Sequence, residues 1–175
     1  MICLTGLPLA GKTTLALRLA KKYDFTYVST GDVVRGLGKL DKDFSDLEHM
    51  KKTGYSLKRN EYIMELVKHA PYRSIIDGYP RNLEQVVIIP NIPIVVLLVE
   101  HVSILAARAK VRGRDEMDGY WLERVKSFDK FLTKLQRLRP ISILITTSQE
   151  KCYDYLEILA KEHRQNGGVL FKLRA

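Results

Sequence analysis

The 175-residue sequence has only two cysteines, Cys3 and Cys152, and they lie far apart. Two distant thiols do not make the disulfide framework of a small secreted domain, so we expect free cysteines in a reducing compartment. Long apolar runs are also absent, since the longest, Ile94 to Val99, is far short of the ~20 residues that span a bilayer. No signal-peptide pattern opens the chain, which predicts a soluble, cytoplasmic protein that does not enter membranes.

Acidic residues are fewer than basic residues in this sequence. The chain has 29 Lys+Arg against 20 Asp+Glu, a formal net charge of +9. A basic surplus attracts both nucleic acids and nucleotide phosphates, and the charge alone does not choose between them. The basic C-terminal segment lacks interleaved aromatic residues beyond Phe171, which favours a solvated helix end over a nucleic-acid site. Length and composition suit one globular domain, residues 1–175.

Strand and helix patterns alternate along the chain. Short segments rich in branched apolar residues predict strands at Ile2–Thr5, Thr26–Ser29, Ser74–Asp77, Ile94–Val99 and Ile141–Thr146. Apolar residues three and four apart predict helices at Lys12–Tyr23, Leu47–Thr53, Asn60–His69, Leu83–Val87, Ile104–Lys110, Tyr120–Leu138 and Gln149–His163. We expect an irregular connection over Gly36–Asp46. The alternation predicts an α/β fold of three layers around a five-stranded parallel sheet.

A glycine-rich segment follows the first predicted strand. Gly6 to Thr13 match the pattern Gly-x-x-x-x-Gly-Lys-[Ser/Thr] without a gap. Glycines let successive backbone N–H groups wrap a phosphate, and the next helix turns its positive end toward the anion. The pattern therefore predicts a P-loop NTPase fold. We expect ATP to bind at Gly6, Leu7, Pro8, Leu9, Ala10, Gly11, Lys12, Thr13 and Thr14.

A carboxylate ends the apolar segment Ser74–Asp77. P-loop enzymes use an Asp at such a position, together with the P-loop hydroxyl, to hold Mg²⁺ and its water shell. Thr13 and Asp77 are accordingly the predicted metal-site residues, although an isolated Asp at a strand end is more often a turn former.

Two further segments resemble the adenylate kinase family of nucleoside monophosphate kinases. Ser29-Thr30-Gly31-Asp32 followed by Arg35 is similar to one family segment, and Asp77-Gly78-Tyr79-Pro80-Arg81 followed by Gln85 is similar to another. The resemblance runs from about Met1 to Leu159. It implies a P-loop kinase domain with a small helical acceptor-binding insert at about 36–69 and a very short lid at about 112–116, acting as a monomer.

The resemblance implies acceptor roles for several residues. Arg35 and Arg81 would hold the acceptor α-phosphate, which suits their forked guanidinium groups. Gln85 would read the base, because an amide offers a donor and an acceptor that match adenine. The predicted acceptor-binding residues are Thr30, Gly31, Arg35, Gly54, Leu57, Gly78, Arg81 and Gln85.

The resemblance also implies a group of charged residues around the transferred phosphoryl, where charge neutralisation is the main catalytic need. The predicted catalytic residues are Lys12, Arg81, Arg108, Arg112, Arg114, Asp115 and Arg124. Leu9 stands where the family usually has glycine. It must avoid a positive φ or bear strain of about 1–2 kcal/mol.

Three functions follow from these patterns. The favoured one is an Mg²⁺-dependent kinase that converts ATP and AMP to two ADP, with nucleotides as its partners and nucleic acid disfavoured. The second is a kinase of UMP, CMP or another nucleotide. The third is an ATPase of similar fold that acts as an assembly factor, which the short lid and the basic surplus would suit.

Overall fold

Parallel strands form the centre of the molecule. The structure, a computed structural model, describes residues 1–40, 44–89, 91–98, 101–111, 121–138 and 143–165. Its strands are β1 (Ile2–Thr5), β2 (Thr26–Ser29), β3 (Ser74–Asp77), β4 (Ile94–Leu97) and β5 (Ile143–Thr146). They pair in parallel in the order β2-β3-β1-β4-β5, which confirms the predicted sheet. The carboxyl ends of β1 and β3 therefore lie side by side, where parallel sheets bind ligands.

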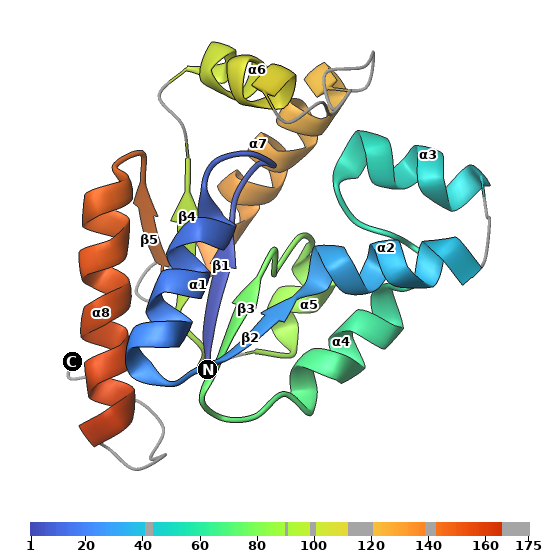
Figure 1. The fold of residues 1–175 in the computed structure, drawn as a ribbon. Helices are drawn as coiled ribbons and strands as arrows, with labels where there is room; N and C mark the ends of the chain where they lie inside the picture. Colours follow the sequence, from blue (N-terminus) through green and yellow to red (C-terminus); the bar gives the residue numbers. More distant parts are fainter. Residues whose placement is uncertain (41–43, 90, 99–100, 112–120, 139–142, 166–175) are drawn as a thin grey trace.

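Eight helices surround this sheet in the described part of the chain (Figure 1). They are α1 (Lys12–Tyr23), α2 (Thr30–Leu40), α3 (Phe44–Thr53), α4 (Asn60–Lys68), α5 (Leu83–Val87), α6 (Val102–Val111), α7 (Trp121–Leu138) and α8 (Gln149–Gln165). The alternation of strand and helix confirms the three-layer α/β fold.

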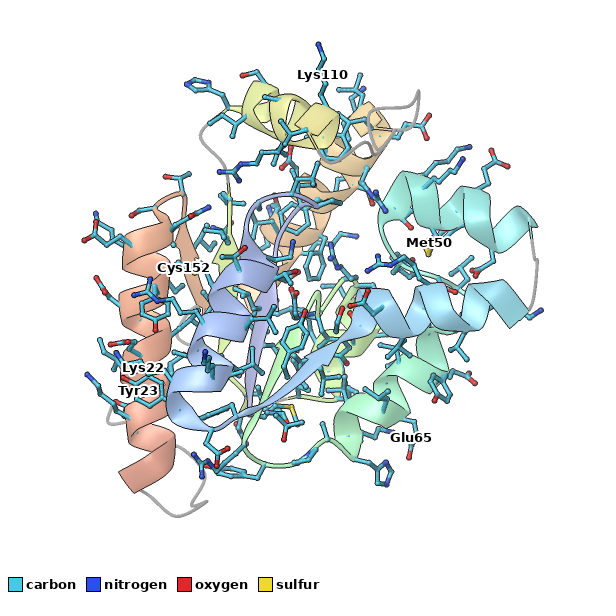
Figure 2. The ribbon with its side chains drawn as sticks, viewed as in Figure 1. Lys22, Tyr23, Met50, Glu65, Lys110 and Cys152 are labelled. Atoms are coloured by element: carbon cyan, nitrogen blue, oxygen red, sulfur yellow. The ribbon has the colours of Figure 1, made fainter. Side chains whose placement is uncertain are left out.

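One face of the sheet is covered by α1 and α8. Side chains of successive strand residues point to opposite faces, so Ile2 and Leu4 of β1 pack on this side while Cys3 packs on the other. Lys22 and Tyr23 lie where the end of α1 adjoins α8 (Figure 2), and Lys22 pairs with Glu157. Both cysteines are buried thiols outside any disulfide, and burial raises the pKa of Cys152 to about 12.

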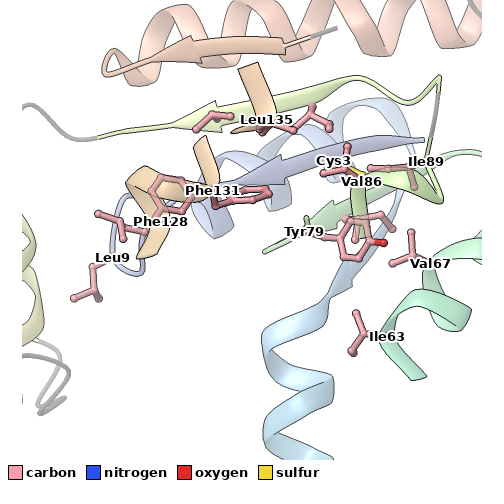
Figure 3. Close-up of a cluster of buried hydrophobic side chains, with 14 of the residues drawn as sticks. Cys3, Leu9, Ile63, Val67, Tyr79, Val86, Ile89, Phe128, Phe131 and Leu135 are labelled. Carbon is pink, nitrogen blue, oxygen red and sulfur yellow. The ribbon is translucent and has the colours of Figure 1, made fainter. Parts of the chain in front are cut away.

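The opposite face carries the larger cluster of buried side chains, from α4, α5, α6 and α7. Tyr79 is fully buried in it and lies near Val67 and Val86 (Figure 3). Phe131 and Leu135 of α7 pack under the sheet in the same cluster. Burial of each such side chain stabilises the fold by about 1.5–3 kcal/mol. This packing holds the ends of β1 and β3 against α5 and α7.

The expectation of an irregular connection over Gly36–Asp46 was wrong. Gly36 lies inside α2, and Asp46 lies in the first turn of α3. Three glycines among eleven residues disfavour a helix by about 1 kcal/mol each, which hid α2 from a propensity argument. Its start did carry a signal, since Ser29 accepts a hydrogen bond from the Asp32 N–H as an N-terminal cap.

The predicted bounds of β1, β2, β3, α1 and α5 match the structure at both ends. The described ends of the other predicted elements lie within a few residues of the prediction, and β4 ends at Leu97. Among the described helices, none is both long enough and apolar enough to cross a membrane.

Candidate nucleotide-binding site

The glycine-rich segment forms a tight loop between β1 and α1. Gly6 and Gly11 have φ values of 147° and 102°, which side-chain-bearing residues rarely adopt. A Cβ atom on Gly6 would collide with the carbonyl oxygen of Leu97. The buried Lys12 reaches back across the loop and donates to the Leu7 carbonyl over 2.7 Å. The loop thus has the tight, positive-φ geometry for which the phosphate-binding pattern supplies glycines.

Leu9 adopts the left-handed conformation, with φ at 64°. The sequence left two possibilities for Leu9, a negative φ or a strained positive φ, and the structure has the strained one. The side chain is buried and lies beside Phe128 of α7 (Figure 3). Its carbonyl accepts a hydrogen bond of 2.8 Å from Nη1 of Arg108. Apolar burial and this hydrogen bond together offset the strain of about 1–2 kcal/mol.

Thr13 and Asp77 meet where α1 begins and β3 ends. The Thr13 hydroxyl donates to Oδ2 of Asp77 over 2.6 Å, and the Tyr27 hydroxyl donates to the same oxygen over 3.0 Å. Burial, followed by the nearby Asp77 charge, raises the pKa of Tyr27. The other oxygen, Oδ1, is buried and has no hydrogen-bond partner in the described part of the chain. A buried, unpartnered carboxylate oxygen beside a hydroxyl suits a hydrated Mg²⁺, so the residues fit the ion.

Arg81 crosses from β3 to the P-loop. Its Nε donates to the Gly78 carbonyl over 2.7 Å, and its Nη1 donates to the Gly6 carbonyl over 3.0 Å. Burial, with a smaller effect of the Arg124 charge, lowers the pKa of Arg81 to about 10. Arg81 therefore remains charged at neutral pH, in surroundings that penalise its charge.

A second guanidinium lies close to Arg81. Arg124 on α7 donates from Nη2 to the Met50 carbonyl of α3 over 3.1 Å. Both guanidiniums lie beside Gly54, because a Cβ atom built there would lie 3.6 Å from Arg124 Nε and 3.9 Å from Arg81 Nη1. Two close cations favour a bound anion between them, since it relieves their mutual repulsion.

Asp46 shapes the turn between α3 and α4. Its carboxylate accepts hydrogen bonds from the Ser56 hydroxyl, the Lys58 N–H and the Arg59 guanidinium. Although burial acts to raise it, these hydrogen bonds and the Arg59 charge lower the pKa of Asp46 overall. The turn holds Tyr55 and Ser56 against the cavity described next.

One cavity of about 200 Å³ adjoins Lys12, Thr13, Asp77, Arg81 and Arg124. Of the predicted residues, its wall includes Pro8, Leu9, Lys12, Thr13, Thr30, Gly31, Arg35, Gly54, Asp77, Gly78, Arg81, Gln85 and Arg124. The wall contains four basic side chains and one carboxylate, so the cavity favours an anionic ligand. Because P-loop residues and the predicted acceptor residues line the same space, the structure brings the two predicted sites together.

Tyr55 and Ser56, which also line the cavity, lie between the predicted residues Gly54 and Leu57. The other lining residues were not predicted from the sequence: Ser29, Val34, Met50, Asn60 and Ile63. Met50 points inward from α3 toward α2 (Figure 2). Ser29 could have been found from its capping position before Asp32. Asn60 could not, because its partners lie 22 to 25 residues away along the chain.

Some predicted residues lie away from the cavity wall. Leu57 is 58% exposed and does not line it. Arg108 contacts the P-loop through the Leu9 carbonyl rather than the cavity. The remaining loop residues, Gly6, Leu7, Ala10, Gly11 and Thr14, form the P-loop without lining the cavity. The predicted lid residues Arg112, Arg114 and Asp115 lie outside the described residues.

Known proteins are similar to this chain in sequence. The sequence profile of the AAA domain family matches residues 5–123, more than half of the chain. An adenylate kinase of Rickettsia conorii is 34% identical over 91 residues, which are 49% of this chain and 43% of the relative. One from Flavobacterium psychrophilum is 37% identical over 91 residues, 48% of this chain and 47% of the relative.

The matches thus span less than half the length of the curated relatives. They confirm the resemblance to adenylate kinases that the sequence motifs indicated. With the strand–loop–helix geometry of Gly6 to Thr13 and the parallel sheet around it, they place the chain in a family: it belongs to the AAA domain family.

Proposed function

We propose that this chain is a nucleoside monophosphate kinase that transfers the terminal phosphoryl group of ATP to AMP. One observation carries the proposal: P-loop Lys12 shares a cavity with Arg35, Arg81 and Arg124 and with the amide of Gln85. A triphosphate-binding loop, an arginine-rich phosphate site and a base-reading amide in one space suit transfer between two nucleotides. The named relatives support the same reaction class.

The basic residues of the cavity would have different roles in the reaction. Lys12 would bind the outer phosphates of the donor at the P-loop. Arg81 and Arg124, which both lie beside Gly54, would hold the acceptor phosphate and neutralise charge as the phosphoryl group moves. Arg35, exposed and paired with Asp32 over 2.5 Å, would turn from that carboxylate to the acceptor phosphate. Closure of these groups around both nucleotides would exclude water.

Thr13 and Asp77 would hold Mg²⁺ in this reaction, since their geometry fits the ion. When bound, Mg²⁺ would neutralise charge on the donor phosphates. We also propose a cytoplasmic monomer. The two buried cysteines, which form no disulfide, support a reducing compartment.

The deciding experiment incubates the purified protein with ATP, Mg²⁺ and each of AMP, UMP, CMP, GMP and dTMP, and follows both products by chromatography. We expect ADP to form rapidly with AMP only. Arg81→Ala should abolish this transfer and so controls for a contaminating kinase. A lane without acceptor measures ATP hydrolysis.

Two other outcomes would contradict the proposal. Transfer to UMP or CMP in place of AMP would keep the kinase class and reject Gln85 as an adenine reader. ATP hydrolysis in every lane, with no monophosphate consumed, would identify an ATPase instead.

A further inference from the structure

A chain of hydrogen bonds runs from the surface of α5 to the cavity. The exposed Glu84 carboxylate accepts from Nδ2 of Asn60 over 2.7 Å. Oδ1 of Asn60 accepts from Nε2 of Gln85 over 2.9 Å, and Oε1 of Gln85 accepts from the Arg81 N–H over 2.6 Å. Asn60 and Gln85 are 7% and 3% exposed, and both line the cavity. A surface carboxylate is thereby connected to a buried amide.

The group at each end of this series of hydrogen bonds can act in only one way, as an acceptor or as a donor. A carboxylate only accepts and a backbone N–H only donates, whereas an amide side chain can turn either end to a partner. Glu84 therefore requires Nδ2 of Asn60, which turns Oδ1 of Asn60 toward Gln85. The Arg81 N–H requires Oε1 of Gln85, which turns Nε2 of Gln85 toward Asn60.

Asn82 imposes the same order. Its Oδ1 accepts from the Gln85 N–H over 2.9 Å, so its Nδ2 faces Asn60 and donates to Oδ1 over 3.1 Å. Oδ1 of Asn60 thus receives two donors. Reversing the Asn60 amide would oppose donors to donors at Asn82 and at Gln85, and an unmet buried polar group costs about 1–3 kcal/mol.

We propose that Glu84 and Asn60 are positioning residues that act with the Arg81 N–H to fix the direction of the Gln85 amide, and that they thereby strengthen the preference of the cavity for one base over another. The inference rests on the proposed function. With one Nε2 hydrogen and one Oε1 lone pair committed, Gln85 keeps one donor and one acceptor. In a fixed order, these match a purine edge with a ring acceptor beside an amino group, as in AMP. The 6-oxopurine edge of IMP presents the opposite order.

The test compares equilibrium binding of AMP and IMP, measured by calorimetry without a donor nucleotide. Glu84→Lys replaces an acceptor by a donor and conflicts with the present Asn60 direction. The ratio of the IMP to the AMP dissociation constant should fall about tenfold, the effect of one misdirected hydrogen bond. Glu84→Gln can accept or donate, so its fall should be smaller.

Glu61→Lys is the matched control, because Glu61 is an exposed carboxylate next to Asn60 and undergoes the same charge change. It should leave the ratio unchanged. Asn60→Leu, which removes the link at similar volume, should lower the ratio at least as much as Glu84→Lys. Since Glu84 is exposed, its variants keep the test valid if Asn60→Leu does not fold.

An equal loss of AMP and IMP affinity in Glu84→Lys and Asn60→Leu, with the ratio kept, would overturn the inference. So would an unchanged ratio in all variants. If the wild-type protein prefers AMP to IMP but transfers no phosphoryl group, the proposed kinase reaction is wrong. The change in the ratio of the two dissociation constants among the variants would still test this inference. If it binds neither monophosphate, the inference is wrong too.

Discussion

The Thr13 hydroxyl lies 2.6 Å from Oδ2 of Asp77 and donates to it, so the first turn of α1 and the end of β3 meet at one carboxylate. Tyr27 donates to the same oxygen from β2. Two elements, α1 and β2, thus hold the carboxylate at the end of β3, with both hydroxyl donors on one of its oxygens. The unpartnered Oδ1 is thereby kept available.

In Tyr27→Phe, the Mg²⁺ concentration at the midpoint of ATP binding should rise about tenfold. The reason is that a carboxylate which has lost a hydrogen-bond partner holds a metal ion less firmly. The measurement is the ATP dissociation constant across a Mg²⁺ titration, read by calorimetry. Tyr62→Phe, at a tyrosine that is 54% exposed on α4, is the control. An unchanged Mg²⁺ midpoint in Tyr27→Phe would show that its hydroxyl has no such role.

AMP should stabilise the protein through Arg81. At an AMP concentration of one hundred times its dissociation constant, unfolding should require about 2.7 kcal/mol more free energy. Arg81→Met removes the guanidinium and should abolish most of this gain at the same AMP concentration, since charged hydrogen bonds contribute about 1.5–3 kcal/mol each. Thermal melts with and without AMP measure the effect. Arg137→Met, on the exposed side of α7, should behave as the wild type, and equal AMP stabilisation in Arg81→Met would reject the assignment.

Asp46→Asn should lower the free energy of unfolding at pH 7 by about 3 kcal/mol, because it breaks a buried charged pair. The pKa of Asp46 is lowered in the folded protein, so its contribution is present above the ordinary value of 3.8 and disappears as pH falls through the folded value. Urea denaturation at pH 7 and below pH 3.8 should show the difference from wild type shrinking in acid. Asp154→Asn, exposed on α8, is the control, and a difference that grows in acid would contradict the assignment.

Leu9→Gly should cost less stability than Leu9→Ala, although it removes more atoms. Both variants lose the buried side chain, but only glycine adopts a φ of 64° without strain. Urea denaturation should separate them by about 1 kcal/mol. Leu15, buried in helix α1, is the control, because there glycine should be worse than alanine by about 1 kcal/mol. The same order at both positions would show that the backbone at Leu9 is not strained.

The inner strands β1, β3 and β4 could be predicted closely from the sequence because they are buried on both faces and therefore read as short apolar runs. The bounds of β1, β2 and β3 match the prediction. Helix α2 could not be predicted from propensity. Its glycines disfavour a helix locally, and contacts such as that of Thr30 with the Asp77 carbonyl are made only in the folded chain.

The site was predictable where a residue's role depends on its own short segment. The P-loop is such a case, since glycine spacing and the following helix define it. Asn60 and Glu84 are the opposite case, because their importance depends on contacts between α4 and α5 that no spacing reveals. Arg124 was predicted, but its place beside Gly54 depends on the packing of α3 against α7.

The donor that holds Oε1 of Gln85 belongs to the main chain at Arg81, not to a side chain. Every amino acid except proline keeps that N–H, so mutation at 81 can remove the guanidinium and still leave the amide oriented. Changes at the neighbouring Asn60 or Glu84 would therefore weaken the preference for AMP over IMP but would not reverse it. A change of acceptor to a 6-oxopurine nucleotide would therefore require a substitution of Gln85 itself.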